Sequence, residues 1–173
     1  MPRAQILEAL AGYPGGRILV ATLGDDPAAG AEVSVTVPGR AMWRVHSVVA
    51  QLDTDGTAAN RVPRFDFAYG GRTIYSVAST VAATADTIVN FAAGEGCDHG
   101  GSVAAGAVTM PLPPLLLQPG ATFATVTDAI VAGDNWAAPV LYVTEIPERG
   151  PDVWAELIAA LRAELSARAG MGI

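Results

Sequence analysis

Short runs in which hydrophobic and polar residues alternate recur along most of the chain, and this pattern is typical of β-strands with one buried face. In the run 31–37, three valines at odd positions alternate with Glu32, Ser34 and Thr36. The run 60–69 alternates in the same way and has aromatic residues on one face. Both runs are therefore predicted to be strands.

A longer strand is predicted over residues 41–52, with Trp43, Val45 and Val49 on one face and His46 on the other. Because proline cannot donate to a β-ladder, Pro63 in the following run indicates an edge strand or a bulge. Further strands are predicted over 17–23, 72–78 and 86–92.

Turn-forming residues separate these runs. Asp53–Gly56 is predicted to be a tight hairpin turn, and Gly70–Gly71 is predicted to begin another hairpin. Residues 93–107 are mostly glycine, alanine and small polar residues, so they are predicted to form a long exposed loop.

The segment 110–146 combines a stiff lead with two strand-like runs. Its four prolines between positions 111 and 119 forbid a helix and favour extended backbone. The runs 121–127 and 136–146 follow, separated by the polar turn Gly133–Asn135. We predict that these two runs form the closing hairpin of an antiparallel sheet.

The C-terminal segment has helical rather than strand periodicity. Pro151 suits the first position of a helix predicted over 152–169, which follows the hinge 147–151. A continuous apolar stripe on this helix consists of Trp154, Leu157, Ile158, Leu161 and Leu165. The stripe is predicted to be an assembly interface, with packing on its own domain as the alternative. A short amphipathic helix is predicted over residues 2–11.

Roughly eight or nine short strands with frequent turn residues predict a mainly β protein, an antiparallel β-sandwich of the jelly-roll kind with a C-terminal amphipathic α-helix. The expected organisation is an N-terminal arm over 1–16, a β-sandwich domain over 17–146, and the hinge and C-terminal helix over 147–173.

Composition excludes several classes of function. The formal net charge is −7, and all ten basic residues are arginine. An acidic chain of this kind is not expected to bind nucleic acid through its phosphates. The sequence has no uninterrupted apolar run of about 18 residues, so no membrane-spanning helix is expected. We also expect no signal peptide.

Reactive side chains gather only at Cys97, Asp98 and His99. A metal site needs further ligands, and the other histidine, His46, lies on a predicted strand. Cys97 is the single cysteine, so no intrachain disulfide is possible. We interpret the cluster as incidental residues of an exposed loop, and we predict no metal and no cofactor.

Other signatures of catalysis or ion binding are incomplete. Asp53–Gly56 begins like a calcium-binding loop, but the twelfth position is Arg64 rather than glutamate. The sequence contains no Gly-x-Ser-x-Gly elbow and no phosphate-binding glycine pattern before a helix. We therefore predict that the protein is not an enzyme and has no catalytic residues.

Trp43 and Trp136 each follow a turn that contains glycine and begin a strand. With Tyr69 and Tyr75 they offer a surface on which sugars stack in a carbohydrate-binding module. The alternative is burial of both tryptophans, which we favour.

Three stretches, taken in order, suggest a family. They are Pro38–Val45, Thr57–Arg61, and Leu116–Gly120 continuing through Gly133–Trp136. Over roughly residues 37–146 the chain resembles a group of small structural proteins of tailed bacteriophages. Their shared features are a Pro-Gly start to the first long strand, an Ala-Asn-Arg step, a leucine-rich lead ending in Pro-Gly, and a Gly-Asp turn before the last strand.

The resemblance implies a component of the phage virion that is made in the host cytoplasm. The function expected first is a capsid decoration or cement protein, a homo-oligomer with a trimer favoured, which binds the major capsid protein or other virion proteins. The alternative is a β-sandwich module of the neck, tail or baseplate that binds a partner protein or a host-surface carbohydrate.

Overall fold

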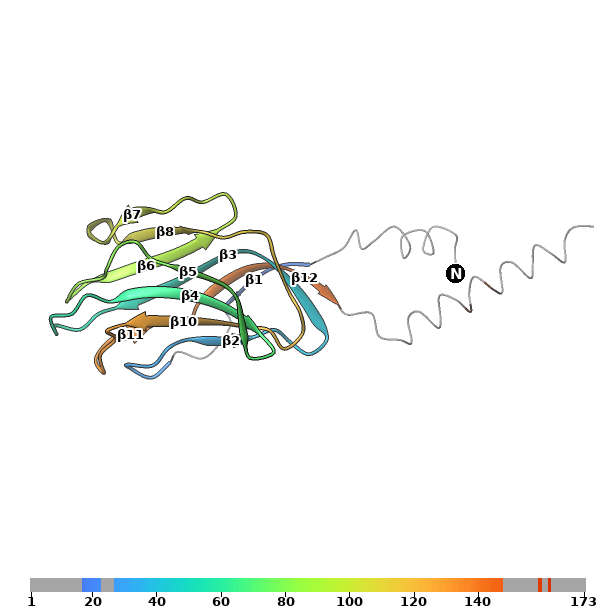
Figure 1. Ribbon diagram of the computed structural model, residues 1–173, viewed down its shortest axis with the longest axis horizontal. Helices are drawn as coiled ribbons and strands as arrows, with labels where there is room; N and C mark the ends of the chain where they lie inside the picture. The colour runs from blue at the N-terminus through green and yellow to red at the C-terminus, as the bar shows by residue number, and fades with distance from the viewer. Residues whose placement is uncertain (1–16, 23–26, 148–158, 160–161, 163–173) are drawn as a thin grey trace, which may run out of the picture.

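The chain forms a mainly β structure, shown as a computed structural model in Figure 1. The structure describes residues 17–22, 27–147, 159 and 162. The strands and the short 3₁₀ helix η1 have these bounds: β1 Arg17–Thr22, β2 Ser34–Thr36, β3 Ala41–Asp53, β4 Val62–Tyr69, β5 Arg72–Ala78, β6 Ile88–Gly94, β7 Gly100–Ser102, η1 Val103–Ala105, β8 Ala107–Pro111, β9 Leu115–Leu117, β10 Thr122–Asp128, β11 Asn135–Trp136 and β12 Val140–Pro147.

The strands form two sheets. The eight-stranded sheet has the order β1-β12-β3-β6-β8-β7, and β9 and β11 also pair with β3. The four-stranded sheet has the order β2-β10-β4-β5. All pairings of named strands are antiparallel except that of β6 with β8, which is parallel. The larger sheet is therefore mixed, and the predicted antiparallel pairing holds for every pair of named strands except this one.

One hydrophobic core draws on both sheets. Val35 is buried, as the alternation of residues 31–37 predicts. In the four-stranded sheet, Phe65 and Phe67 pack against Phe123, with ring centroids 5.3 Å and 5.4 Å apart. Such tilted aromatic contacts contribute about 0.5–1.5 kcal/mol each beyond the apolar area that they bury. The predicted strand over 60–69 is thus confirmed, and of the aromatic residues on its one face Phe65 and Phe67 are buried while Tyr69 is exposed.

A β-bulge changes the phase of β3. Pairing with β12 shifts between Tyr142 and Val143, so that one residue of β3, His46, has no direct partner. A bulge reverses which residues face inward beyond it. Val48 is therefore fully buried while Val49 is 37% exposed, and the prediction that Val49 shares the inward face with Trp43 was wrong.

The predicted closing hairpin of residues 110–146 was also wrong. β10 belongs to the four-stranded sheet, whereas β11 and β12 pair with β3 in the other sheet. The turn at Asp53–Gly56 likewise connects β3 of one sheet to β4 of the other rather than closing a hairpin. Alternation gives each strand its inward face, but it does not say which sheet the strand joins.

The hairpin at Gly70–Gly71 is confirmed. Tyr69 pairs with Arg72, and both glycines have positive φ, 58° and 76°. Positive φ at both central residues is what a type I′ turn requires. The neighbouring strand β4 lies between β10 and β5, so the expectation of an edge strand or bulge at Pro63 was wrong. Pairing with β5 ends at Arg64, so the missing N–H of Pro63 interrupts no ladder there.

The predicted loop 93–107 contains more structure than its composition indicated. It continues β6 to Gly94 and includes β7 and η1. Gly101 has a φ of 89° and lies so close to β8 that a Cβ atom would be 2.8 Å from the Cα of Val108. Glycine at this position thus allows β7 and β8 to pair, which composition alone did not reveal.

The first and last strands are neighbours, since Arg17 of β1 pairs with Glu145 of β12. The predicted N-terminal helix over 2–11 lies outside the described residues. Of the predicted helix 152–169 the structure describes only Ala159 and Arg162, both helical and exposed, which do not define an element by themselves. Among the described residues, no helix is long and apolar enough to cross a membrane.

Candidate functional site

Two segments carry the chain between the sheets at the same end of the molecule. The first crossover, residues 54–61, connects β3 to β4, and the second crossover, residues 129–134, connects β10 to β11. They meet because Asp53 pairs with Asn135 where β3 and β11 join. Three buried polar side chains lie in these crossovers: Thr54, Arg61 and Asp134.

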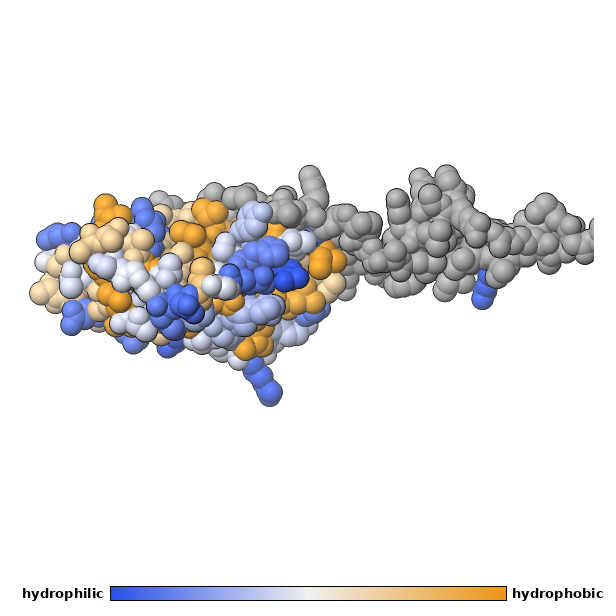
Figure 2. Space-filling model, turned by 90° about the horizontal axis from the view of Figure 1, so that it is seen from above, coloured by the Kyte–Doolittle hydropathy of each residue, from blue (hydrophilic) through white to orange (hydrophobic). Residues whose placement is uncertain are grey.

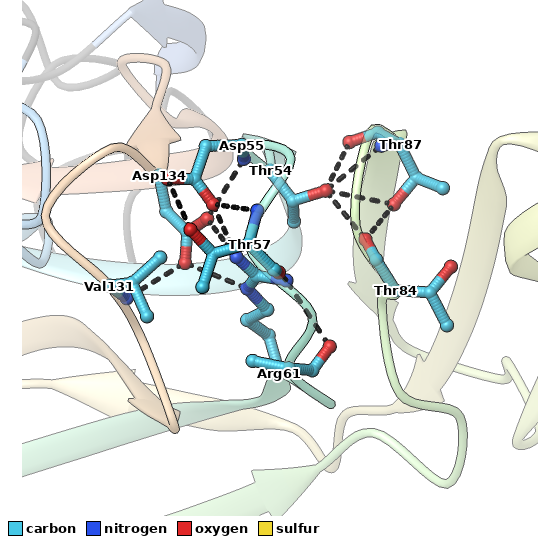
Figure 3. Close-up of polar contacts among 9 residues, drawn as sticks. Thr54, Asp55, Thr57, Arg61, Thr84, Thr87, Val131 and Asp134 are labelled. Carbon is cyan, nitrogen blue, oxygen red and sulfur yellow. Dashed lines mark hydrogen bonds and ion pairs between the residues drawn. The ribbon is translucent and has the colours of Figure 1, made fainter.

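Arg61 is fully buried and joins the two crossovers (Figure 3). Its Nε donates to Asp134 Oδ2 at 2.9 Å and its Nη2 donates to Asp134 Oδ1 at 2.8 Å, which is a two-pronged ion pair. Nη2 also donates to Asp55 Oδ1 at 2.8 Å. Nη1 donates to the carbonyl oxygens of Thr57 at 2.8 Å and Ala59 at 3.2 Å. The rigid fork of the guanidinium thus contacts acceptors from both crossovers.

Asp134 is also fully buried and accepts hydrogen bonds from two backbone groups. The N–H of Asp55 donates to its Oδ1 at 3.0 Å, and the N–H of Val131 donates to its Oδ2 at 2.9 Å. Each carboxylate oxygen of Asp134 therefore has one partner in Arg61 and one in the backbone. Within the described part of the chain, no buried side-chain nitrogen or oxygen lacks a hydrogen-bond partner.

The protein environment of this pair shifts the pKa values of both side chains in the direction that keeps them ionised. Burial by itself raises the pKa of Asp134, but the hydrogen bonds from Arg61 and from the N–H groups of Val131 and Asp55, with the positive charge of Arg61, bring the pKa below its ordinary value. The hydrogen bond to Asp134 raises the pKa of Arg61, against an opposing effect of burial. Both groups are therefore ionised at neutral pH.

Threonines extend the network to the segment that precedes β6. The hydroxyl of Thr54 donates to the carbonyl oxygen of Thr84 at 2.6 Å and accepts from the N–H of Thr87 at 2.9 Å. Nearby, Arg61 and Ala83 exchange two backbone hydrogen bonds, at 2.9 Å and 2.8 Å. We call Thr54, Asp55, Arg61, Thr84, Thr87 and Asp134 the crossover network.

The crossover network is arranged for cohesion rather than for reaction. Catalysis by a carboxylate needs an oxygen that can reach substrate, but both oxygens of Asp134 are occupied and enclosed. An arginine that recognises an anionic ligand likewise needs free donors, and those of Arg61 face protein acceptors. An open depression of about 380 Å³ lies beside the network. It is lined by Ala58, Ala59, Asn60, Thr84 and Ala85.

Neither Arg61 nor Asp134 was predicted as a site residue, although one signal pointed to the arginine. Counting back by two from Pro63, which is buried, places Arg61 on the inward face of its run. A buried arginine requires an anionic partner. The identity of that partner was not readable, because Asp134 is 73 residues away in the chain.

The residues suggested as a reactive cluster do not converge. Cys97 is partly buried, while Asp98 and His99 are exposed. The Asp98 carbonyl accepts a hydrogen bond from the Thr109 hydroxyl at 2.9 Å, which fixes the backbone rather than a ligand. Among the described residues, no group of three or more His, Cys, Asp or Glu side chains is placed to hold a metal ion. The calcium-like Asp53–Gly56 segment instead directs Asp55 towards Arg61.

His46 lies apart from Cys97–His99 in its contacts. Its Nε2 is 2.7 Å from the Thr144 hydroxyl and its Nδ1 is 3.7 Å from a Glu95 carboxylate oxygen. Glu95 also lies 3.4 Å from the Arg44 guanidinium. These are partly exposed contacts between neighbouring side chains of β3, β12 and the end of β6.

The proposed sugar-stacking residues are not assembled on one surface. Trp43 and Trp136 are buried, and their indole N–H groups donate to Glu145 at 3.0 Å and Thr127 at 3.2 Å. Burial of both tryptophans, the favoured alternative, is confirmed, so neither ring is available to a sugar. Tyr69 is 49% exposed.

Tyr75, the fourth of these aromatic residues, is partly buried. Its hydroxyl donates to the carbonyl oxygen of Pro111 at 3.0 Å, and burial raises its pKa. Tyr75 thus links β5 to β8. The predicted assembly stripe, Trp154, Leu157, Ile158, Leu161 and Leu165, lies outside the described residues.

Comparison of the chain with family models, with curated proteins and with solved structures gives no match.

Proposed function

We propose that this protein is a structural component of a phage virion, a capsid decoration or cement protein that binds the head shell as a homo-oligomer. In this proposal the two sheets form a jelly-roll-like sandwich, and the protein is made in the host cytoplasm before it joins the particle. Its partners are other copies of itself and the major capsid protein.

The observation that carries the proposal is the saturated crossover network. Arg61 and Asp134 bind each other and nearby protein groups, so this buried ion pair holds together the two crossovers that connect the sheets. This arrangement favours a rigid binding protein over an enzyme. The two stretches Thr57–Arg61 and Gly133–Trp136, which carry part of the resemblance to phage structural proteins, meet through this ion pair. The two stretches thus share one structural role, which is to hold the two crossovers together.

A neck, tail or baseplate module is the alternative location. A carbohydrate-binding role there receives less support, since Trp43 and Trp136 are buried. A role in binding a partner protein is compatible with the exposed apolar side chains of the eight-stranded sheet, which include Val49, Leu116 and Tyr142. Figure 2 shows hydrophobic residues (orange) at the surface among polar ones.

The deciding experiment is a cryo-electron microscopy map of purified phage particles that contain this chain. We expect copies at regular positions on the outside of the head shell. Copies on the neck or tail would replace the decoration role with the alternative. A protein that is absent from purified particles would overturn the virion proposal.

A further inference from the structure

Asp55 of the crossover network is followed directly by Gly56, and this is the only Asp-Gly step in the sequence. In any chain, the backbone nitrogen that follows an aspartate lies near the side-chain carbon Cγ, and a bond between the two closes a five-membered ring. Glycine leaves this nitrogen unobstructed, because it carries no side chain. The Asp-Gly step therefore has the covalent structure that favours attack of the backbone on the side chain.

The attacking group is accessible in the folded protein. Gly56 is exposed, and the Asp55 side chain is 30% exposed, so water reaches both residues. Among the hydrogen bonds of the described residues, none is donated by the N–H of Gly56. This nitrogen is therefore held neither in a β-ladder nor by a side chain, and it can lose its proton to solvent.

The Asp55 carboxylate, in contrast, is held by two neighbouring residues (Figure 3). Its Oδ1 accepts from Arg61 Nη2 at 2.8 Å and from the Thr57 N–H at 2.9 Å. Its Oδ2 accepts from the Thr57 hydroxyl at 3.1 Å. Ring closure expels one carboxylate oxygen as water and leaves the other as a neutral carbonyl. The reaction therefore removes the charge-assisted hydrogen bond to Arg61, whichever oxygen leaves.

We propose that Asp55–Gly56 is a site of spontaneous isomerisation, which the contacts of Arg61 and Thr57 suppress in the folded protein. The Gly56 nitrogen loses its proton and forms a bond to Asp55 Cγ, and one carboxyl oxygen leaves as water, which gives a succinimide. Water then adds to one of the two ring carbonyl groups. Breaking the bond from nitrogen to Cγ restores aspartate. Breaking the original main-chain bond instead leaves the chain connected through Cγ, which is isoaspartate.

The product disrupts the crossover network. Isoaspartate adds one methylene group to the main chain between residues 55 and 56 and leaves the free carboxylate on the Cα carbon. The Asp55 carbonyl oxygen, which accepts from the N–H of Asp86 at 3.0 Å, becomes part of that carboxylate. The new carboxylate is one carbon shorter in reach than the side chain that contacted Arg61. The contacts that suppress the reaction are therefore lost once it has occurred.

The test measures the rate of isoaspartate formation at neutral pH in the natural full chain, in Arg61→Met/Asp134→Leu, and in a synthetic peptide of residues 50–61. The double variant removes Arg61 without leaving an unpaired buried carboxylate. Liquid chromatography with electron-transfer mass spectrometry of the digested samples distinguishes isoaspartate from aspartate. We expect the natural protein to react about tenfold more slowly than the peptide and the double variant, which corresponds to about 1.4 kcal/mol in activation free energy. Adding Gly56→Ala to the double variant should slow its reaction, because the methyl group obstructs the attacking nitrogen.

Equal rates in the natural protein and the folded double variant would show that Arg61 does not restrain Asp55, and the proposal would fail. It would also fail if neither the peptide nor the double variant formed isoaspartate. Near-ultraviolet circular dichroism checks the fold of each protein before incubation. If the double variant is unfolded, Thr57→Val replaces it, since this change removes only the hydroxyl contact to Asp55. Thr57→Val should react faster than the natural protein, and an equal rate would overturn the restraint. Neither the site nor its test depends on the proposed virion function.

Discussion

Arg61 and Asp134 are 73 residues apart in the chain, and their two hydrogen bonds, at 2.9 Å and 2.8 Å, fasten together the crossovers between the sheets. Asp55 adds a third contact to Arg61 from the first crossover. These two crossovers therefore share one buried charge pair. Several properties of the protein depend on that pair.

Replacing one partner of the pair should destabilise the protein strongly. In Arg61→Met the buried carboxylate of Asp134 loses its counter-charge, and we expect a loss of about 3–5 kcal/mol in the free energy of unfolding, measured by urea denaturation. Arg64→Met is the matched control, because Arg64 pairs with Asp66 on the surface and should change stability by about 1 kcal/mol or less. The double variant Arg61→Met/Asp134→Leu should recover part of the loss. Equal effects of Arg61→Met and Arg64→Met would contradict the assigned role.

The same pair should make the protein sensitive to acid. The pKa of Asp134 is lowered by folding, so its ionised form stabilises the folded state. That contribution is complete above the unfolded-state pKa of roughly 4 and is lost as the pH falls through the lower folded-state pKa. The stability difference between the natural protein and Asp134→Asn should therefore be large at pH 7 and shrink below about pH 4. A difference that stays constant across this range would show that Asp134 does not titrate as inferred.

Gly133 should be intolerant of a side chain. A Cβ atom there would meet the Asp55 side chain, with the Asp55 Cβ and Cγ atoms 2.9 Å away. Gly133→Ala must displace Asp55 from Arg61, and we expect a lower melting temperature by several degrees. Gly39→Ala is the control, since an added Cβ at Gly39 would meet nothing within 4 Å. A Gly133→Ala protein as stable as the Gly39→Ala protein would mean that the crossovers adjust easily.

The bulge in β3 buries one of two adjacent valines, Val48, and exposes the other, Val49. Val48→Ala removes methyl groups from the core and should cost about 1–2 kcal/mol, whereas Val49→Ala on the outward side should change stability by about 0.5 kcal/mol or less. Chemical denaturation of the two variants gives the comparison directly. If Val49→Ala proves the more costly, the register beyond His46 is shifted by one residue from that described.

The folded protein should not depend on a metal ion. We expect that elemental analysis finds no stoichiometric metal and that EDTA leaves the melting temperature unchanged. A bound metal whose removal clearly lowers the melting temperature would instead point to the Cys97–His99 segment.

Local patterns predicted the strands well and their partners poorly. Alternation alone placed Val35 on the buried face and put Phe65 and Phe67 on one face of their strand, since that pattern depends only on neighbouring residues. The hairpin at Gly70–Gly71 was equally readable, because two consecutive glycines permit the required positive φ angles.

Features that depend on distant parts of the chain could not be predicted from local sequence patterns. Nothing near residue 128 indicates that β10 and β11 belong to different sheets, because that choice is made by contacts with β4 and β3. The bulge at His46 likewise depends on pairing with β12. The phase of Arg61 in its run was a signal of burial that the prediction did not use, and only the fold brings Asp134 beside it.

The pairing of β1 and β3 with β12 has a consequence for how the chain folds during synthesis. β3 also pairs with β9 and β11, so much of the eight-stranded sheet can form only after residues 115–147 have been synthesised. The β4–β5 hairpin can form as soon as it leaves the ribosome, whereas β1 cannot pair until β12, the last strand, has been synthesised. Such long-range pairing is slow because a large loop must close first. Newly made chains should therefore spend an interval with unpaired strand edges, in which chaperones bind them.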